Sequence, residues 1–172
     1  DLAEHSTFEE TAYLIIYGRL PTRAELTRWT DRLVQARPIP SYLMDALRRL
    51  PKEAHPMAVL RTAVSILGCH DPLADKIEIP NCERIGVDLI AKMATIAGAV
   101  MRMRNGQEPI PPDPKLSHAA NFLYMCTGKV PDDFSARVMD ANLVLHVDHG
   151  MNASTFTAMV IASSLSDLYS AI

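Results

Sequence analysis

The residues best suited to chemistry lie together in the stretch 145–156, whose sequence is LHVDHGMNASTF. His146, Asp148 and His149 stand there in an otherwise apolar neighbourhood, at the junction of two expected helices. An imidazole titrates near physiological pH. A turn at the junction would place His149 beside the free backbone N–H groups that begin the second helix, where the helix dipole attracts negative charge. The pattern indicates a binding site for a small anion such as a dicarboxylate.

Three other interpretations of this stretch remain open. His146, Asp148 and His149 could bind a metal ion, but the two histidines are not four residues apart on a helix and no set of cysteines or carboxylates supports them, so no metal is expected. Ser154 or Thr155 could be a nucleophile, although a serine before an apolar helix is typical of a cap and no glycine-flanked elbow surrounds it. The histidines could also be hydrogen-bonded core residues that cap a turn.

The other histidines and the arginine clusters give weaker signals. His55 precedes Pro56 at the start of an expected helix, where the missing N–H of proline has no cost, so its role is expected to be structural. Three further histidines have ordinary surroundings, namely His5, His70 and His118. The arginines at 48–49 and 102–104 are interpreted as solvated helix faces rather than phosphate sites.

Composition places the chain among ordinary globular proteins. It has 172 residues, of which 48% are hydrophobic and 22% are charged, with a formal net charge of −3, so one sizeable core is feasible and no nucleic-acid partner is indicated. Its cysteines are odd in number and form no CxxC pair, which favours a reducing compartment. No apolar run is long enough for a membrane span and the first residues lack a signal-peptide pattern, so a cytoplasmic protein is expected.

Helical signals recur along the whole chain, and no stretch alternates convincingly as a strand would. Capping-box patterns at 6–9 and 22–25 predict two helix starts, and Gly18, Gly68, Gly106 and Gly128 are expected at helix ends. The spacing predicts a helix over 7–17, a second between Thr22 and Pro38, and others over 41–50, 55–67, 82–105, 115–127, 132–146 and 153–171. The stretches 69–80 and 109–114 are expected to be connections. The fold class is therefore all-α.

The expected helix 82–105 is apolar on more than one face. Ala94 and Gly98 lie four residues apart, and small residues at that spacing let two helix backbones approach closely. Such a helix is buried either between layers of one subunit or at an interface between subunits. The pattern alone favours the first of these.

Five segments together resemble one known family. They are the stretch 6–10 (STFEE) with Leu14, the stretch 17–22 (YGRLPT), the triplet 55–57 (HPM), the triplet 90–92 (IAK) and above all 146–156 (HVDHGMNASTF). In this order and at this spacing they resemble the citrate synthase family of the bacterial and archaeal type. The resemblance runs along the whole chain, which makes it much more specific than any single motif.

The resemblance implies a multi-helical, almost strand-free acyltransferase that condenses oxaloacetate with acetyl-CoA and water to give citrate, the first step of the tricarboxylic acid cycle. In such an enzyme a large and a small domain close over the substrates, and no cofactor is needed beyond acetyl-CoA as a substrate. Residues 1–172 would be part of the large domain. The second histidine of the His-x-x-His stretch helps to bind oxaloacetate, a role that falls on His149. The helices near 55–67 and 82–105 would pack against their copies in a homodimer, which reverses the preference stated above.

The sequence departs from the family pattern chiefly by stopping early. Neither end of the chain carries a start or stop signal, so these residues are expected to be part of a larger protein. The small domain and the C-terminal catalytic part are missing, so no catalytic residue is assigned within this stretch. Met159 stands where many relatives carry arginine.

Two alternative functions stay open. One is 2-methylcitrate synthase, which uses propionyl-CoA; relatives of that kind more often carry Glu-His-Glu where this chain has Asp148, His149 and Gly150, which favours citrate. A single methylene is worth only about 1–3 kcal/mol of discrimination in a pocket. The other is a non-catalytic truncated relative that acts as a dimerisation or scaffold module.

Overall fold

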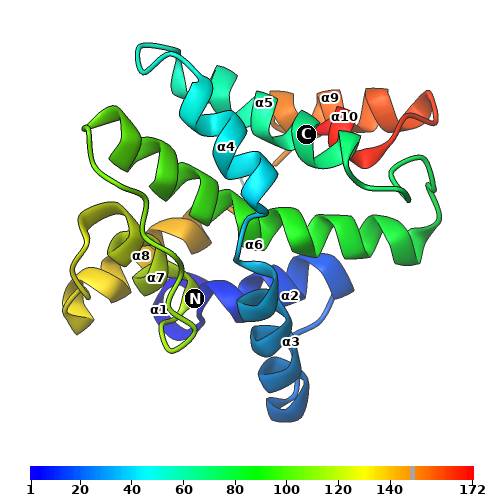
Figure 1. The fold of residues 1–172 in the computed structure, drawn as a ribbon. Helices are drawn as coiled ribbons and strands as arrows, with labels where there is room; N and C mark the ends of the chain where they lie inside the picture. The colour runs from blue at the N-terminus through cyan, green and yellow to red at the C-terminus, as the bar shows by residue number, and fades with distance from the viewer. Residues whose placement is uncertain (148–149) are drawn as a thin grey trace.

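The longest helix, α6 (Ile79–Arg104), runs through the middle of the molecule and separates two groups of helices (Figure 1). The computed structural model describes residues 1–147 and 150–172. Helices α4, α5, α9 and α10 lie on one side of α6, and α1, α2, α3, α7 and α8 lie on the other. Contacts of α6 with α3, α5, α7 and α10 join the two groups. All regular structure in the described residues is helical, which confirms the predicted fold class.

The helices follow the expected order closely. Their bounds are α1 (Leu2–His5), α2 (Phe8–Tyr17), α3 (Arg23–Ala36), α4 (Ser41–Arg49), α5 (Pro56–Cys69), α6 (Ile79–Arg104), α7 (His118–Thr127), α8 (Asp133–Leu145), α9 (Ala153–Ser163) and α10 (Leu168–Ala171). Of the helices formed by these residues, none has both the length and the apolar character that a membrane crossing requires.

Helix α6 serves two separate apolar cores, which confirms that it is buried on more than one face. Val87 and Ala91 pack with Trp29 and Leu33 against α2 and α3. On the opposite face, a larger core joins α6 to α4, α5 and α10; its buried α6 members are Ile85, Leu89, Ile96 and Val100. A single helix therefore connects both halves, as expected for a helix buried between layers.

The predicted close packing at Gly98 occurs within the chain. A Cβ atom built on Gly98 would lie 3.0 Å from Cβ of Met125 on α7, so the absence of a side chain lets the two helices approach. Gly98 is thus occupied by an intrachain contact, and Ala94 beside it is half-buried. This contact explains the small residue without a partner subunit.

The first capping box lies one residue later than predicted. Thr7, not Ser6, is the N-cap of α2, and its hydroxyl accepts from the Glu10 N–H while the Glu10 carboxylate accepts from the Thr7 N–H at 2.8 Å. Ser6 instead ends the short helix α1, which the sequence did not predict because four residues show no periodicity. The second box, at Thr22 and Glu25, is confirmed.

The prediction of one helix over 153–171 is wrong. The chain turns at Leu165, whose φ of 61° is left-handed, and α10 restarts behind Asp167, whose carboxylate accepts from the Ser170 N–H at 3.0 Å. The break carries Tyr169 back onto α5. Neither glycine nor proline marks this break, which is why the residue pattern did not predict it.

Three boundary predictions also need correction. The helix predicted over 115–127 begins only at His118, behind the Ser117 cap. Helix α6 begins at Ile79 rather than near position 82, because Pro80 is accommodated in the first turn, where its N–H is not needed. Gly68 does not end α5, which continues to Cys69. A Cβ on Gly68 would lie 2.9 Å from the Tyr169 Cβ, so this glycine makes room for α10.

Candidate functional site

The predicted anion site falls at the junction of α8 and α9. Helix α8 ends with His146 as its C-cap, and the His146 Nδ1 lies 2.7 Å from the carbonyl oxygen of Asn142. Helix α9 begins behind Asn152, whose side-chain oxygen accepts from the Thr155 N–H at 2.7 Å. The predicted site residue His149 and its neighbour Asp148 lie outside the described residues. The structure thus gives the two helix ends that flank the site.

The start of α9 assigns the capping role to Asn152 rather than to Ser154. Ser154 and Thr155 lie in the first turn of α9 and line a hollow of about 480 Å³ that is also bounded by Ile172. A left-handed Gly150, with φ of 88°, precedes the cap, and the Asn152 N–H donates to its carbonyl at 3.0 Å. This turn sets the first backbone N–H groups of α9 beside the junction, which is the arrangement that favours an anion.

Helix α9 is the least covered part of the site. None of its residues is buried, and large apolar side chains are exposed along it, with Phe156 60% and Met159 57% accessible. Met159, where the resemblance led us to expect an arginine, offers only a weak sulfur acceptor.

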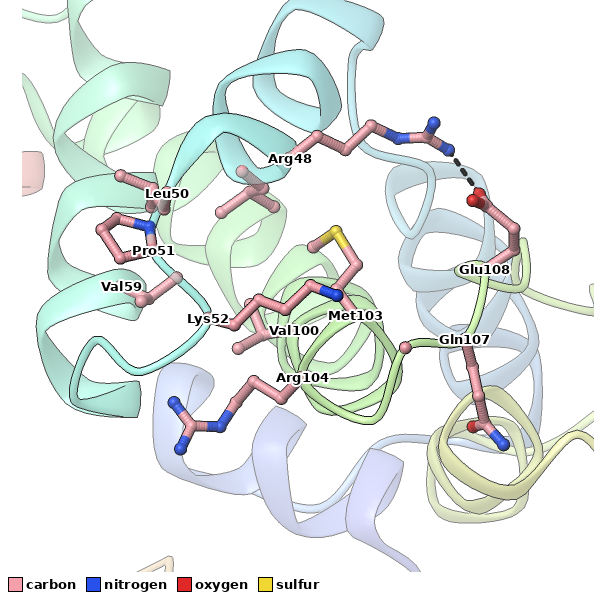
Figure 2. A pocket seen from close by; sticks show the side chains of 12 residues that line it. Arg48, Leu50, Pro51, Lys52, Val59, Val100, Met103, Arg104, Gln107 and Glu108 are labelled. Carbon is pink, nitrogen blue, oxygen red and sulfur yellow. Dashed lines mark hydrogen bonds and ion pairs between the residues drawn. The ribbon is translucent and has the colours of Figure 1, made fainter.

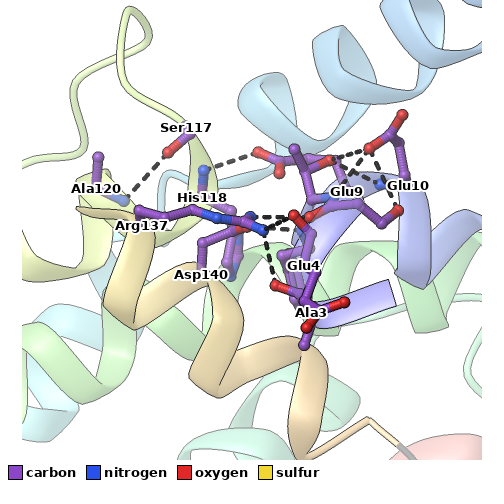
Figure 3. Close-up of polar contacts among 12 residues, drawn as sticks. Ala3, Glu4, Glu9, Glu10, Ser117, His118, Ala120, Arg137 and Asp140 are labelled. Atoms are coloured by element: carbon purple, nitrogen blue, oxygen red, sulfur yellow. Dashed lines mark hydrogen bonds and ion pairs between the residues drawn. The ribbon is translucent and has the colours of Figure 1, made fainter. Parts of the chain in front are cut away.

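Helix α8, by contrast, is tied firmly to the N-terminal helices (Figure 3). The Arg137 guanidinium donates to the carbonyls of Ala3, Glu4 and Ser6 at 2.7, 2.9 and 2.9 Å and to the Asp140 carboxylate at 2.9 Å. The other oxygen of Asp140 accepts from the Phe8 N–H at 3.0 Å. We call this set the Arg137–Asp140 clamp.

The clamp matches the dipoles of the helices that it joins. Its cation lies on carbonyls at the C-terminal end of α1, where partial negative charge gathers, and its carboxylate lies on the first N–H of α2, where partial positive charge gathers. The sequence offered no signal for this pairing, because its partners are more than 130 residues apart and only folding brings them together; the Asp140 to Phe8 separation is 132.

His118, which the sequence placed in ordinary surroundings, is a buried residue of this same region. Its ring stacks on Phe8 with centroids 4.4 Å apart, and its backbone N–H donates to the Glu9 carboxylate at 2.8 Å. Burial, helped by the nearby Arg37 cation, lowers the pKa of His118 to about 4, so the imidazole is neutral at physiological pH. Its role is structural and joins α2 to α7.

The remaining histidines outside the junction are His5, His55 and His70, and each has different surroundings. His55 is confirmed as a helix-start residue, since its Nδ1 accepts from the Met57 N–H at 3.2 Å. His70 stacks on Tyr42 with centroids 3.9 Å apart, so its surroundings are more specific than predicted. His5 is exposed on α1.

A second polar group holds α10 in place. Asp71 accepts from Arg84 at 2.6 Å and from the Tyr169 hydroxyl at 2.8 Å. Burial alone would raise the pKa of Asp71, but the hydrogen bonds from Arg84, from the Leu73 N–H and from Tyr169 outweigh it and hold that pKa below its usual value. Burial and the neighbouring carboxylate raise the pKa of Tyr169, so its hydroxyl stays protonated and donates.

Among the described residues, no group of three or more histidines, cysteines or carboxylates is placed to hold a metal ion. The three cysteines are Cys69, Cys82 and Cys126, and each is a free thiol.

The described residues define a class of protein, an all-helical protein in which a layer of helices packs on each side of a central helix. The candidate site lies between two helix ends. A family model described as "Citrate synthase, C-terminal domain" matches residues 1–172. The chain belongs to the citrate synthase family, a family of acyltransferases.

Individual relatives agree with this assignment. The chain is 48% identical over 168 residues to a citrate synthase of Deinococcus radiodurans, covering 98% of this chain and 45% of that enzyme. It is 40% identical over 172 residues to a 2-methylcitrate synthase of Mycobacterium tuberculosis, covering all of this chain and 43% of that enzyme. The crystal structure of citrate synthase from Pyrobaculum aerophilum superimposes with a TM-score of 0.92 at 42% identity, covering 99% of this chain and 44% of that one. The chain thus spans less than half the length of these relatives.

Proposed function

We propose that these residues belong to a citrate synthase that condenses oxaloacetate with acetyl-CoA and water to give citrate and CoA. The observation that carries the proposal is the stretch 146–156 at the junction of α8 and α9, within a chain that belongs to the citrate synthase family. Residues 1–172 would form part of the large helical domain. Relatives named citrate synthase include those of Deinococcus radiodurans and Haloferax volcanii.

In this proposal His149 binds oxaloacetate. His149 stands three residues before the Asn152 cap in the sequence, and the proposal is that it acts together with the N–H groups that begin α9. A proton-donating imidazole near the substrate would polarise the ketone carbonyl, and donors fixed in advance act most strongly as negative charge develops on its oxygen. Backbone N–H groups of α9 would favour the carboxylates.

The reaction then follows in two steps. A base removes a proton from the acetyl-CoA methyl group, and the enol carbon that forms attacks the ketone carbon of oxaloacetate, whose oxygen takes up a proton. Water then hydrolyses the citryl-CoA thioester to citrate and CoA. The aspartate base and histidine acid that this chemistry uses in the family have no counterpart among the candidate residues of this stretch.

We further propose that the protein is a homodimer through α5 and α6. The support is an apolar hollow of about 200 Å³ between these helices, lined by Pro56, Leu60, Ala97, Val100, Met101 and Arg104. Met57 and Met101 are exposed on the same two helices, at 65% and 47%. Exposed apolar groups on neighbouring helices are typical of a protein interface.

The cytoplasm is the proposed location. Three free cysteines and no disulfide among the described residues suit a reducing compartment.

The test is thiol release from acetyl-CoA and, separately, from propionyl-CoA, with and without oxaloacetate, using the complete protein that contains these residues. Oxaloacetate-dependent release that prefers acetyl-CoA, and that falls in a His149→Ala variant but not in the matched His5→Ala variant, is the expected result. A preference for propionyl-CoA would instead support the 2-methylcitrate alternative, which the Mycobacterium tuberculosis relative motivates.

Absence of release with both thioesters would refute the enzyme proposal. A folded dimer without activity would then favour the scaffold alternative. That alternative was considered because the chain covers 45% of the Deinococcus radiodurans enzyme.

A further inference from the structure

A hollow separate from the α8–α9 junction lies where the ends of α4 and α6 meet the start of α5 (Figure 2). Its volume is about 200 Å³. Its floor belongs to the larger core, since Leu47, Val59 and Val100 are each at most 7% exposed, and Leu50 and Met103 complete the apolar wall. We call it the α4–α6 hollow. No residue of α8 or α9 lines it.

Basic side chains dominate the rim of the α4–α6 hollow. Arg48, Lys52 and Arg104 line it, with Glu108 as the one carboxylate among its lining residues. The Glu108 carboxylate forms an ion pair with the Arg48 guanidinium at 2.7 Å, at the outer edge of the hollow (Figure 2). Lys52 has no ion pair or hydrogen bond among the described residues, and in Figure 2 its side chain extends across the hollow. The rim therefore carries an excess of positive charge.

The carbonyl groups at the end of α6 do not occupy the donors of the cations at the rim. At the end of α6, the carbonyls of Met101, Arg102 and Met103 accept from backbone N–H groups of residues 105–107, at 2.9 to 3.3 Å. Arg104 gives one N–H, from Nη1, to the carbonyl of Ala54 at 2.5 Å, and a guanidinium has five N–H donors. Donors on Arg104 and Lys52 are thus left for a ligand.

The surroundings select among anions. Both α4 and α6 end at this hollow, and the partial negative charge at the C-terminal end of a helix disfavours an anion nearby. A phosphate or a dicarboxylate would meet this opposition more strongly than a single carboxylate. The start of α5 does not offset it, because Pro56 has no N–H and the N–H groups of Met57 and Ala58 already donate to His55. The apolar floor favours a hydrocarbon body. At about 30 Å³ for each water-sized group, the volume holds roughly seven non-hydrogen atoms.

From the apolar floor, the basic rim and the volume, we propose that the α4–α6 hollow binds a small monocarboxylate with a short alkyl body, of about the size of hexanoate. The carboxylate lies against Lys52 at the rim, and the alkyl chain lies on Val59 and Met103. Val100 and Arg104, which also line the hollow proposed at the dimer interface, close the inner side of the site. The proposal does not rest on the proposed condensation, because no residue of α8 or α9 is among those that line the hollow.

The experiment is titration of the complete protein with sodium hexanoate, followed by calorimetry and by the NMR signals of the methionine methyl groups. Saturable binding of one hexanoate per chain is expected, with the Met103 methyl signal shifting. Lys52→Gln should weaken binding about two- to fivefold, which is the effect of losing one exposed ion pair. The matched control is Lys129→Gln, which removes an exposed lysine outside the hollow and should leave binding unchanged.

Two further ligands test the chemical class. Hexanol has the same alkyl body without the charge, and inorganic phosphate has the charge without the body; both should bind at least several-fold more weakly than hexanoate. The proposal is overturned if hexanoate does not saturate, if hexanol or phosphate binds equally well, or if Lys129→Gln weakens binding as much as Lys52→Gln. Circular dichroism of both variants confirms that the helices are retained.

Discussion

Replacing Asp140 by alanine tests the Arg137–Asp140 clamp most directly. The Asp140 side chain is 9% exposed and accepts from Arg137 and from the Phe8 N–H, at 2.9 and 3.0 Å. Its removal leaves a part-buried N–H at the start of α2 without an acceptor and takes a carboxylate from a helix N-terminus. A hydrogen bond to a charged group is worth about 1.5–3 kcal/mol, and an orphaned donor costs a similar amount. Because Arg137 keeps its three carbonyl partners, we expect a loss of about 2–4 kcal/mol.

The measurement is thermal and urea unfolding followed by circular dichroism. For a chain of this size, each kcal/mol corresponds to roughly 2–4 °C in Tm, so Asp140→Ala should lower Tm by about 4–16 °C. Asp140→Asn keeps an acceptor for the Phe8 N–H but loses the charge, and should fall between the wild type and the alanine variant. Asp45→Ala removes an exposed carboxylate in the middle of α4 and serves as the matched control, with Tm expected within about 2 °C of the wild type.

The reasoning would be refuted by an Asp140→Ala variant whose Tm matches that of Asp45→Ala. It would also be refuted if Asp140→Asn were as unstable as Asp140→Ala, since the amide oxygen can still accept from Phe8 and the dipole argument predicts an intermediate value.

Three other outcomes can be checked by unfolding experiments. The pKa of His118 falls from 6.5 in the unfolded chain to about 4 in the fold, so between these pH values only the unfolded chain binds the proton. The free energy of unfolding should therefore fall by up to about 3 kcal/mol as pH drops through that window. His118→Phe should flatten the slope of the urea-unfolding free energy against pH. The lowered pKa of Asp71 means that its contribution is present above the ordinary value of 3.8 and is lost as pH falls below it, so Asp71→Asn should reduce the further loss of stability in acid. Gly68→Ala should lower Tm, because overpacking against Tyr169 costs about 1–3 kcal/mol, whereas Gly86→Ala, with no atom within 4 Å of the added Cβ, should raise stability by up to about 1 kcal/mol.

Local chemistry made much of the fold predictable. The Thr22 and Glu25 capping box, the left-handed glycines at 18 and 128 and the prolines between helices act over a few residues, so their positions in the sequence are enough to locate helix ends. The double-faced apolar pattern of α6 was readable for the same reason. The resemblance to the citrate synthase family rested on short ordered motifs, and the family assignment was confirmed.

Features that depend on distant parts of the chain were not predictable in this way. Glu9 was assigned to a local cap, yet its carboxylate accepts from His118, 109 residues away. The turn at Leu165 is made where no glycine or proline occurs, and it is accompanied by the fit of Tyr169 against Gly68 and Asp71. Arg48 and Arg104 were interpreted as parts of separate solvated helix faces, but the fold brings both to the rim of the α4–α6 hollow. A pattern in one segment does not contain these pairings.

The two helices that flank the junction are held to very different degrees, and this bears on how the proposed site is positioned. Helix α8 is fixed to the first eight residues of the chain, because Arg137 donates to their carbonyls and Asp140 accepts from the Phe8 N–H. Helix α9 has no buried residue. The end of α8 at His146 is therefore set by contacts within these 172 residues, whereas the start of α9 is set mainly by its own cap at Asn152. If His149 binds oxaloacetate as proposed, that binding should be sensitive to the clamp, which fixes the helix that ends at His146.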